Sequence, residues 1–133
     1  MNKDSFRSTC PISSSLDLFG DKWTLLIVRD LLYYGSRTFK DFSQSEEHIS
    51  SARLAEKLKK LEQIEALVKE NHPTSKKVFN YSLTQKGKDL APIIVDYIAW
   101  GNKYLNNHIS EESKVFAKNL EKDRKGTLKE IMK

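Results

Sequence analysis

The segment from Lys22 to Tyr34 is apolar on nearly every face of the helix that it predicts. Its large apolar residues are Trp23, Leu25, Leu26, Ile27, Val28, Leu31 and Leu32, and Asp21 is placed to cap it. A helix of this kind belongs at the centre of a fold, because no face of it suits water. A chain of 133 residues can build one modest core, so the other elements have to pack around this helix.

Shorter helices are predicted on both sides of the central helix. Pro11 opens the first and Gly20 ends it, because proline suits the first turn of a helix and glycine suits its C-terminal end. Farther along, Thr38 and Asp41 have the three-residue spacing of a capping box. This pair predicts a short third helix, and the polar run over residues 43–48 predicts a turn after it.

A fourth helix is predicted from Ser50 or Ser51 onwards, with a narrow apolar stripe. The stripe consists of Leu54, Leu58 and Leu61. Beyond this helix, β-branched and aromatic residues replace the helical pattern over residues 67–69 and 78–83. The turn over residues 72–75 makes this pair a β-hairpin.

A long fifth helix is predicted from Thr84, and its apolar face is broader than so small a core requires. That face holds Leu90, Ile93, Ile94, Tyr97, Ile98, Trp100, Tyr104 and Leu105. A charged last helix opens at Ser110 and is expected to break at Gly126. Six helical segments and one hairpin make the predicted fold class α+β, mainly α. We expect residues 1–108 to form the domain and residues 109–133 a charged helical extension.

The net charge of +5 is concentrated in one part of the chain. Between Ile49 and Lys88, nine basic residues stand against four Glu, whereas the rest of the chain is balanced at 14 against 14. The basic residues are Arg53, Lys57, Lys59, Lys60, Lys69, Lys76, Lys77, Lys86 and Lys88. A positive field over one segment suits a polyanion, since neutralised phosphates release counterions, although an ordinary solvated surface carries similar charges.

The order of the elements points to double-stranded DNA. A buried helix, a short helix, a polar turn, a basic helix and a hairpin with Lys76 and Lys77 near its tip make a winged helix-turn-helix. A helix about 10 Å wide fits the major groove of B-DNA, which is about 12 Å wide, and the hairpin can reach an adjacent groove. A helical bundle would explain the core but not the clustered charge. A winged helix that binds protein partners without sequence-specific DNA binding is the alternative that stays open.

Several segments, taken in order, resemble the HxlR-type winged helix-turn-helix regulators. They are Cys10-Pro11, Leu16 to Ile27 with its Gly20-Asp21-Lys22-Trp23 run, Arg37 to Phe42, Ile49-Ser50 with the leucine stripe, Tyr81 to Gly87, and Trp100-Gly101. The resemblance runs from Cys10 to about Leu105. It implies a bacterial transcriptional regulator that binds an inverted repeat as a homodimer, with the N-terminal helix and the fifth helix as dimerisation helices.

This chain departs from the family pattern at two places. Many members have glycine after the fourth helix, whereas this chain has Glu65, so the turn has to avoid or tolerate a positive φ. The wing carries Lys76 and Lys77 where many members have proline. The charge of the wing is therefore better predicted than its shape.

The direction of the leucine stripe predicts the DNA-binding residues. Because the stripe faces the core, the candidates for base edges are Ser51, Ala52, Arg53, Ala55 and Glu56. Arg53 leads them, since a guanidinium can bind guanine O6 and N7 together, and a phosphate clamp or a salt bridge to Glu56 is its alternative role. Phosphate contacts are assigned to Thr38, Lys40, Ser50, Ser51, Lys57, Lys60, Lys76 and Lys77.

The broad apolar face of the fifth helix predicts a homodimer, with the first helix added by the resemblance. The predicted interface residues are Leu16, Leu90, Ile94, Tyr97, Ile98 and Tyr104. Packing of two such helices would place the recognition helices about 34 Å apart, which is one turn of DNA.

Cys10, the only cysteine, is a candidate sensor of oxidants or electrophiles. It precedes Pro11 at the start of the first helix, where the helix dipole and nearby Arg7 would favour the reactive thiolate. The resemblance adds that some HxlR-type regulators sense quinones, aldehydes or oxidants through a cysteine at this position. A small buried residue that packs the N-terminal arm is the alternative.

Other classes of protein are disfavoured by what the sequence lacks. One cysteine and three scattered histidines offer no metal-ligand spacing, and no nucleophile signature, Gly-rich phosphate loop or acidic cluster predicts an enzyme. We expect no catalytic activity, metal or cofactor, and no motif names a small-molecule effector. No apolar run approaches the roughly 20 residues of a membrane span or forms a signal peptide, so we expect a cytoplasmic protein.

Overall fold

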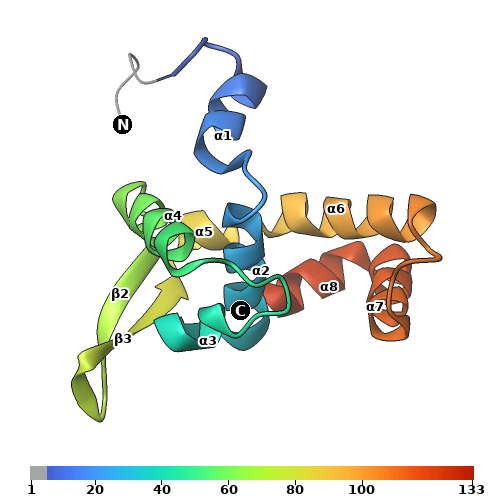
Figure 1. Cartoon of the computed structure of the whole chain (residues 1–133). Helices are drawn as coiled ribbons and strands as arrows, with labels where there is room; N and C mark the ends of the chain where they lie inside the picture. The colour runs from blue at the N-terminus through green and yellow to red at the C-terminus, as the bar shows by residue number, and fades with distance from the viewer. Residues whose placement is uncertain (1–5) are drawn as a thin grey trace. The chain divides into compact units, whose positions relative to one another are not determined.

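The computed structural model describes residues 6–133, which form eight helices and one small sheet (Figure 1). The predicted fold class, α+β and mainly α with a winged helix-turn-helix, is confirmed. The chain separates into two compact units, the first ending at Gly87 and the second beginning at Lys88. The division of the chain at residue 108 into a domain and an extension stays a prediction. Among residues 6–133, no helix is long and apolar enough to cross a membrane.

The N-terminal unit is built around α2, the predicted central helix. Its elements are α1 (Pro11–Phe19), α2 (Thr24–Tyr34), β1 (Ser36–Thr38), α3 (Phe39–Ser43), α4 (Ser51–Gln63), β2 (Leu67–His72), β3 (Ser75–Leu83) and the short α5 (Gln85–Lys88), which reaches the boundary. Ile27, Val28 and Leu31 of α2 are at most 3% exposed. Phe42 of α3 and Leu54 of α4 are buried as well, so three helices contribute to one core.

The predicted hairpin gains a third strand. β2 and β3 pair antiparallel, as expected, and β1 pairs with the other edge of β3, which makes the strand order β1-β3-β2. Ser36 lies opposite Ser82, and Thr38 lies opposite Asn80. β1 has only three residues and no β pattern, so the sequence around it does not predict a strand. It forms because it pairs with residues of β3 that lie about 45 positions farther along the chain.

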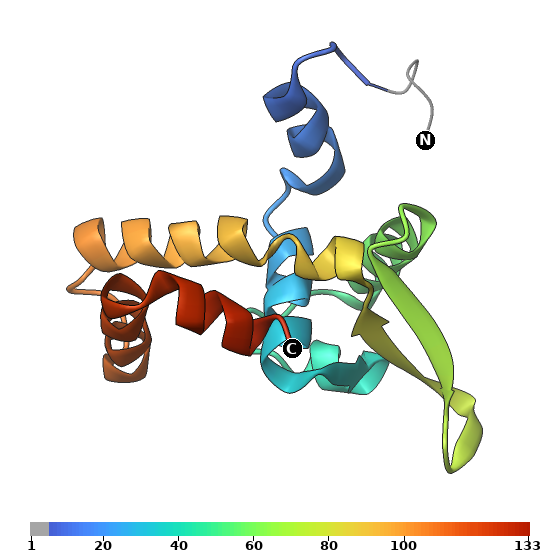
Figure 2. The same ribbon diagram turned by 180° about the vertical axis from the view of Figure 1, so that it is seen from behind.

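The C-terminal unit consists of α6 (Ala91–Tyr104), α7 (Glu111–Lys122) and α8 (Arg124–Ile131). Figure 2 shows α8 running beside α6, and both α7 and α8 contact α6. Val95, Ala117 and Leu120 are buried. Part of this unit therefore has its own packed interior.

Two predicted boundaries in this region are wrong. The long helix expected from Thr84 is divided into α5 and α6, because Pro92 lies in the first turn of α6 and cannot donate the hydrogen bond that a continuous helix needs. The last helix breaks at Asp123 and not at Gly126. The Asp123 carboxylate accepts from the Gly126 N–H at 2.9 Å and so starts α8.

Candidate nucleic-acid interface

α3 and α4 form the helix-turn-helix, and each begins at a side-chain cap. Thr38 Oγ1 accepts from the Asp41 N–H at 3.2 Å, and the Asp41 carboxylate accepts from the Thr38 N–H at 3.0 Å. The predicted capping box is therefore confirmed. The Thr38 N–H also lowers the pKa of Asp41 from its usual value. Ser50 Oγ accepts from the Arg53 N–H at 3.2 Å, which fixes the start of α4 at Ser51.

The face of α4 opposite its leucine stripe, here called the outer face, is exposed. Leu54, Leu58 and Leu61 are 0–3% exposed and face the core. At about 100° per residue, Ala52, Glu56 and Lys59 lie roughly 130–170° around the helix from this stripe, and all three are exposed. Lys59 was not among the predicted contacts, although its angle from the stripe could have identified it.

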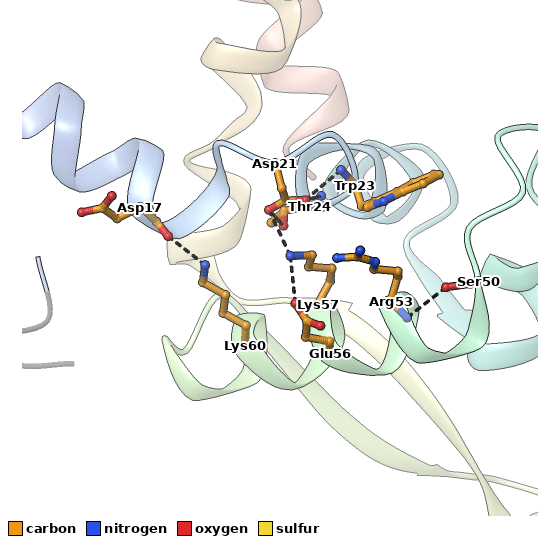
Figure 3. A network of polar contacts seen from close by, with 9 residues as sticks. All are labelled: Asp17, Asp21, Trp23, Thr24, Ser50, Arg53, Glu56, Lys57 and Lys60. Atoms are coloured by element: carbon orange, nitrogen blue, oxygen red, sulfur yellow. Dashed lines mark hydrogen bonds and ion pairs between the residues drawn. The ribbon is translucent and has the colours of Figure 1, made fainter. Parts of the chain in front are cut away.

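Two lysines predicted to contact phosphate are instead engaged within the protein (Figure 3). Lys57 is buried at 8% exposure, and its Nζ lies 3.1 Å from Glu56 Oε1 and 3.6 Å from Asp21 Oδ2. Lys60 Nζ donates to the Asp17 carbonyl oxygen at 2.8 Å. On the helical wheel Lys57 lies only about 70° from the leucine stripe, which explains its burial.

Asp21 is the centre of this network. Its carboxylate accepts from the Trp23 N–H at 2.8 Å, the Thr24 N–H at 2.9 Å and the Thr24 hydroxyl at 2.6 Å. Burial raises the pKa of Asp21, but these hydrogen bonds and the charge of Lys57 outweigh burial and hold the pKa at about 2. Asp21 is therefore ionised at neutral pH and fixed just before α2, although the helix begins at Thr24 with Trp23 as its N-cap and not at Lys22 as predicted.

Arg53 is exposed but does not lie at the centre of the outer face. In Figure 3 its side chain leaves α4 on the same side as Lys57 and Lys60, towards the corner between α1 and α2. No ion pair joins Arg53 to Glu56 among the described residues. This position suits a phosphate beside the helix better than a base edge beneath it.

The wing carries exposed charge at its end. Lys76 and Lys77 are exposed residues near the start of β3, next to the turn of the hairpin. Lys69 Nζ lies 4.6 Å from the centre of the Phe79 ring, so the wing also carries a cation–π pair. Lys40, Ser50 and Ser51, also predicted to contact phosphate, are exposed at the starts of α3 and α4.

The apolar surface of α6 differs in part from the predicted dimer interface. Leu90 and Ile94 are each only 8% exposed and Ile98 is half-buried, so Leu90 and Ile94 offer little surface to a second chain. The exposed apolar residues are instead Ile93, Tyr97, Trp100 and Tyr104, at 40–66% exposure, which we call the α6 stripe. Their spacing of four, three and four residues puts them on one side of the helix. On α1, Ile12 and the predicted Leu16 are also exposed.

Cys10 is an exposed free thiol that stands directly before α1. The alternative of a small buried residue does not fit this exposure. Arg7, which was expected to favour the thiolate, is paired elsewhere, since its Nε lies 2.5 Å from Asp17 Oδ1. Among residues 6–133, no three His, Cys, Asp or Glu side chains are grouped so that they could hold a metal ion.

Comparison with known proteins gives one consistent match. The family model described as HxlR-like helix-turn-helix matches residues 18–109. The HTH-type transcriptional regulator YodB of Bacillus subtilis is 32% identical over 108 residues, which cover 79% of this chain and 96% of YodB. The uncharacterized HTH-type transcriptional regulator YvaP of the same species is 35% identical over 99 residues, which cover 73% of this chain and 90% of YvaP.

Solved structures of similar proteins have the same fold. The reduced form of YodB from B. subtilis has a TM-score of 0.59 at 33% identity and covers 73% of this chain and 95% of its own. YodB has also been solved in quinone-bound and diamide-treated forms. The redox regulator HypR in its oxidized form has a TM-score of 0.64 at 27% identity and covers 71% of this chain and 96% of its own.

The family match covers more than half of the chain, including α3, α4, the wing and α6. The relatives are transcriptional regulators, so the prediction that the chain is not an enzyme is confirmed. The resemblance seen in the sequence is confirmed as well: the chain belongs to the HxlR-like helix-turn-helix family of transcriptional regulators.

Proposed function

We propose that this protein binds double-stranded DNA in the bacterial cytoplasm as a homodimer, on an inverted-repeat operator. The observation that carries the proposal is α4, whose leucine stripe is buried while the opposite face is exposed. In the proposed complex α4 lies in the major groove. Small side chains on its first turns allow close approach to the base edges, which are contacted by Ser51, Ala52, Ala55 and Glu56.

Phosphate contacts surround this face in the proposed complex. They come from Thr38, Lys40, Ser50, Arg53, Lys59, Lys76 and Lys77. Lys57 and Lys60 are left out of this set, because their ammonium groups already contact Asp21, Glu56 and the Asp17 carbonyl. Arg53 is assigned to phosphate because its side chain lies on the flank of α4.

The salt dependence of binding tests this interface. Log affinity should fall nearly linearly with log salt concentration, and the double variant Lys76→Ala/Lys77→Ala should lower the slope by roughly two, about one for each phosphate contact. Lys118→Ala is the matched control, since Lys118 is an exposed lysine of α7. An equal slope for the double variant and the control would contradict the proposed wing contacts. Absence of duplex binding at low salt would favour the alternative, a winged helix that binds protein partners.

The dimer is proposed to form through the α6 stripe. Ile93, Tyr97, Trp100 and Tyr104 form an exposed apolar row on one helix, and a symmetric pairing of two such rows removes both from water. Trp100 and Tyr104 have ring centroids 5.1 Å apart, so the row contains a preformed aromatic pair. Leu16 on α1 is a further exposed apolar residue for the partner chain to contact.

Cys10 is proposed as the residue through which oxidants or electrophiles act on DNA binding. Its exposure supports this role, as do the quinone-bound and diamide-treated forms of YodB and the description of HypR as a redox regulator. Diamide or a quinone should change the operator affinity of the unmodified chain and leave that of Cys10→Ser unchanged. If mass spectrometry shows that Cys10 is modified while affinity stays the same, the sensor role is lost.

A further inference from the structure

Lys57 is a buried cation on a helix that is otherwise exposed on its outer face. It is 8% exposed, whereas its neighbour Glu56 has a side chain that is 60% exposed. A lysine is almost never buried without a partner, because removing its charge from water is costly. The ion pair with Glu56 lies within α4 and therefore does not connect this helix to another element. Asp21, at 3.6 Å, is the partner that links α4 to another element.

Asp21 is a rigid partner. Three hydrogen bonds from Trp23 and Thr24 fix its carboxylate at the start of α2, and Thr24 is itself buried at 1% exposure. A carboxylate held in this way cannot follow Lys57 if α4 moves. The ion pair therefore fixes the position of α4 relative to α2.

Lys60 makes a second link one turn farther along α4. Its Nζ donates to the carbonyl oxygen of Asp17, one of the last carbonyls of α1, at 2.8 Å. These last carbonyls have no partner within their own helix, and a cation there is favoured by the helix dipole. The Asp17 carboxylate is held by Arg7. Two neighbouring turns of α4 are thus joined to the corner where α1 ends and α2 begins (Figure 3).

We propose that Lys57 and Lys60 are positioning residues, which hold the recognition helix against the α1–α2 corner and contact no DNA. The inference rests on the proposed function, since it assumes that α4 enters the major groove. Base readout depends on the placement of α4, whereas attraction to phosphate depends mainly on charge. Loss of a positioning contact therefore lowers the preference for the correct sequence, and loss of a phosphate contact weakens binding to every sequence.

The test uses the full chain, a duplex that the unmodified chain selects from a random pool, and a duplex of scrambled sequence. Lys57→Met keeps most of the side-chain volume without the charge, and Asp21→Asn keeps an oxygen for the N–H groups of Trp23 and Thr24. Each variant should lose about tenfold in affinity for the selected duplex. Affinity for the scrambled duplex and the salt slope should stay unchanged. The double variant should be no worse than either single variant, because both remove the same contact.

Lys59→Ala is the matched control on the same helix, since Lys59 is exposed and proposed to contact phosphate. It should weaken both duplexes and lower the salt slope by about one. If Lys57→Met behaves like Lys59→Ala, Lys57 contacts DNA and the inference is overturned. If the unmodified chain selects no duplex, the proposed function fails, which is a different result. Asp21→Asn tests the same contact without altering α4, so the inference can still be tested if the Lys57 variant misfolds. If Asp21→Asn prefers the selected duplex over the scrambled one as strongly as the unmodified chain does, the inference is overturned.

Discussion

Glu65 lies directly after the C-cap of α4, in a backbone conformation that favours glycine. Its φ is 62°, in the left-handed region that side chains with a Cβ rarely adopt. The hydrogen bonds around it are those of a Schellman motif: the Glu65 N–H donates to the Glu62 carbonyl, and the Ala66 N–H donates to the Leu61 carbonyl. The departure from glycine noticed in the sequence is thus tolerated at the cost of local strain.

Replacing Glu65 by glycine should therefore stabilise the protein. We expect Glu65→Gly to raise the free energy of unfolding by about 1 kcal/mol, because the strain of a Cβ at positive φ is removed. Urea unfolding followed by circular dichroism measures this change. Glu65→Ala removes the same carboxylate but keeps the Cβ, so a similar gain in that variant would assign the effect to charge and not to the backbone.

The lowered pKa of Asp21 predicts how the stability of the protein responds to acid. Burial raises the pKa of Asp21, but hydrogen bonds and Lys57 lower it from 3.8 to about 2. A carboxylate with a lowered pKa in the folded state stabilises the protein above about pH 4, and this contribution is lost as the pH falls towards 2. The free energy of unfolding, measured with urea at about half-unit intervals between pH 5 and pH 2, should decline less in Asp21→Asn than in the unmodified chain. An identical decline in both proteins would mean that Asp21 is not held in this way.

At the scale of elements, the stability of the short helix α3 depends on the cap at its start. α3 has five residues, too few to be stable alone, and its capping box satisfies two backbone groups at its start. β1 immediately precedes this box and pairs with β3. The cap at Thr38 therefore joins the sheet to the first helix of the helix-turn-helix.

Thr38→Ala tests this cap. Loss of the side-chain acceptor at the N-cap should lower the free energy of unfolding by about 1 kcal/mol. Thr38→Ser keeps the hydroxyl and is the matched control, which should lose much less. The measurement is chemical unfolding, and equal losses in the two variants would point to the methyl group of Thr38 and not to its hydroxyl.

The elements that the sequence predicted well are those with a strong local signal. α2, α3, α4 and the β2–β3 hairpin follow from apolar periodicity, caps and a proline-containing turn. The sequence signals for the break before α6 and for the start of α8 are weak, because the apolar pattern continues across Pro92 and Asp123 lies only three residues before Gly126. Of the interface, the direction of α4 could be predicted from its leucines. The partners of Lys57 and Lys60 could not, since Asp21 and Asp17 lie 36 and 43 residues away in the chain.

At the scale of the whole molecule, α6 carries two kinds of apolar residue, namely buried ones and those of the exposed α6 stripe. Ile94 is 8% exposed, whereas Trp100 three residues beyond Tyr97 is 59% exposed. A substitution in the exposed row of such a helix can therefore leave its buried side, and with it the fold, intact. The broad apolar face predicted from the sequence thus contains a buried surface and an exposed one, and only the exposed one is available to the proposed partner chain.

Trp100→Glu should convert the proposed dimer to a folded monomer. A charge in the centre of an apolar interface has no partner and is costly to bury, whereas the same charge in the monomer is solvated. Light scattering gives the mass, and circular dichroism checks the fold. Asn106→Glu, an exposed position beyond α6, is the control and should stay dimeric. Ile94→Glu should unfold the chain instead. A Trp100→Glu protein that remains a dimer would exclude the α6 stripe as the interface.

The ion pair between Lys57 and Asp21 also has a consequence for inheritance. A lineage that loses the carboxylate at position 21 leaves a buried cation at position 57 without its partner from α2, and the reverse loss leaves the carboxylate without its lysine. Neither change is neutral by itself, so the two positions should evolve together. Ala52 and Lys59, on the outer face of α4, belong to no such pair among the described residues, so in the proposed complex they can change freely when a descendant acquires a new operator.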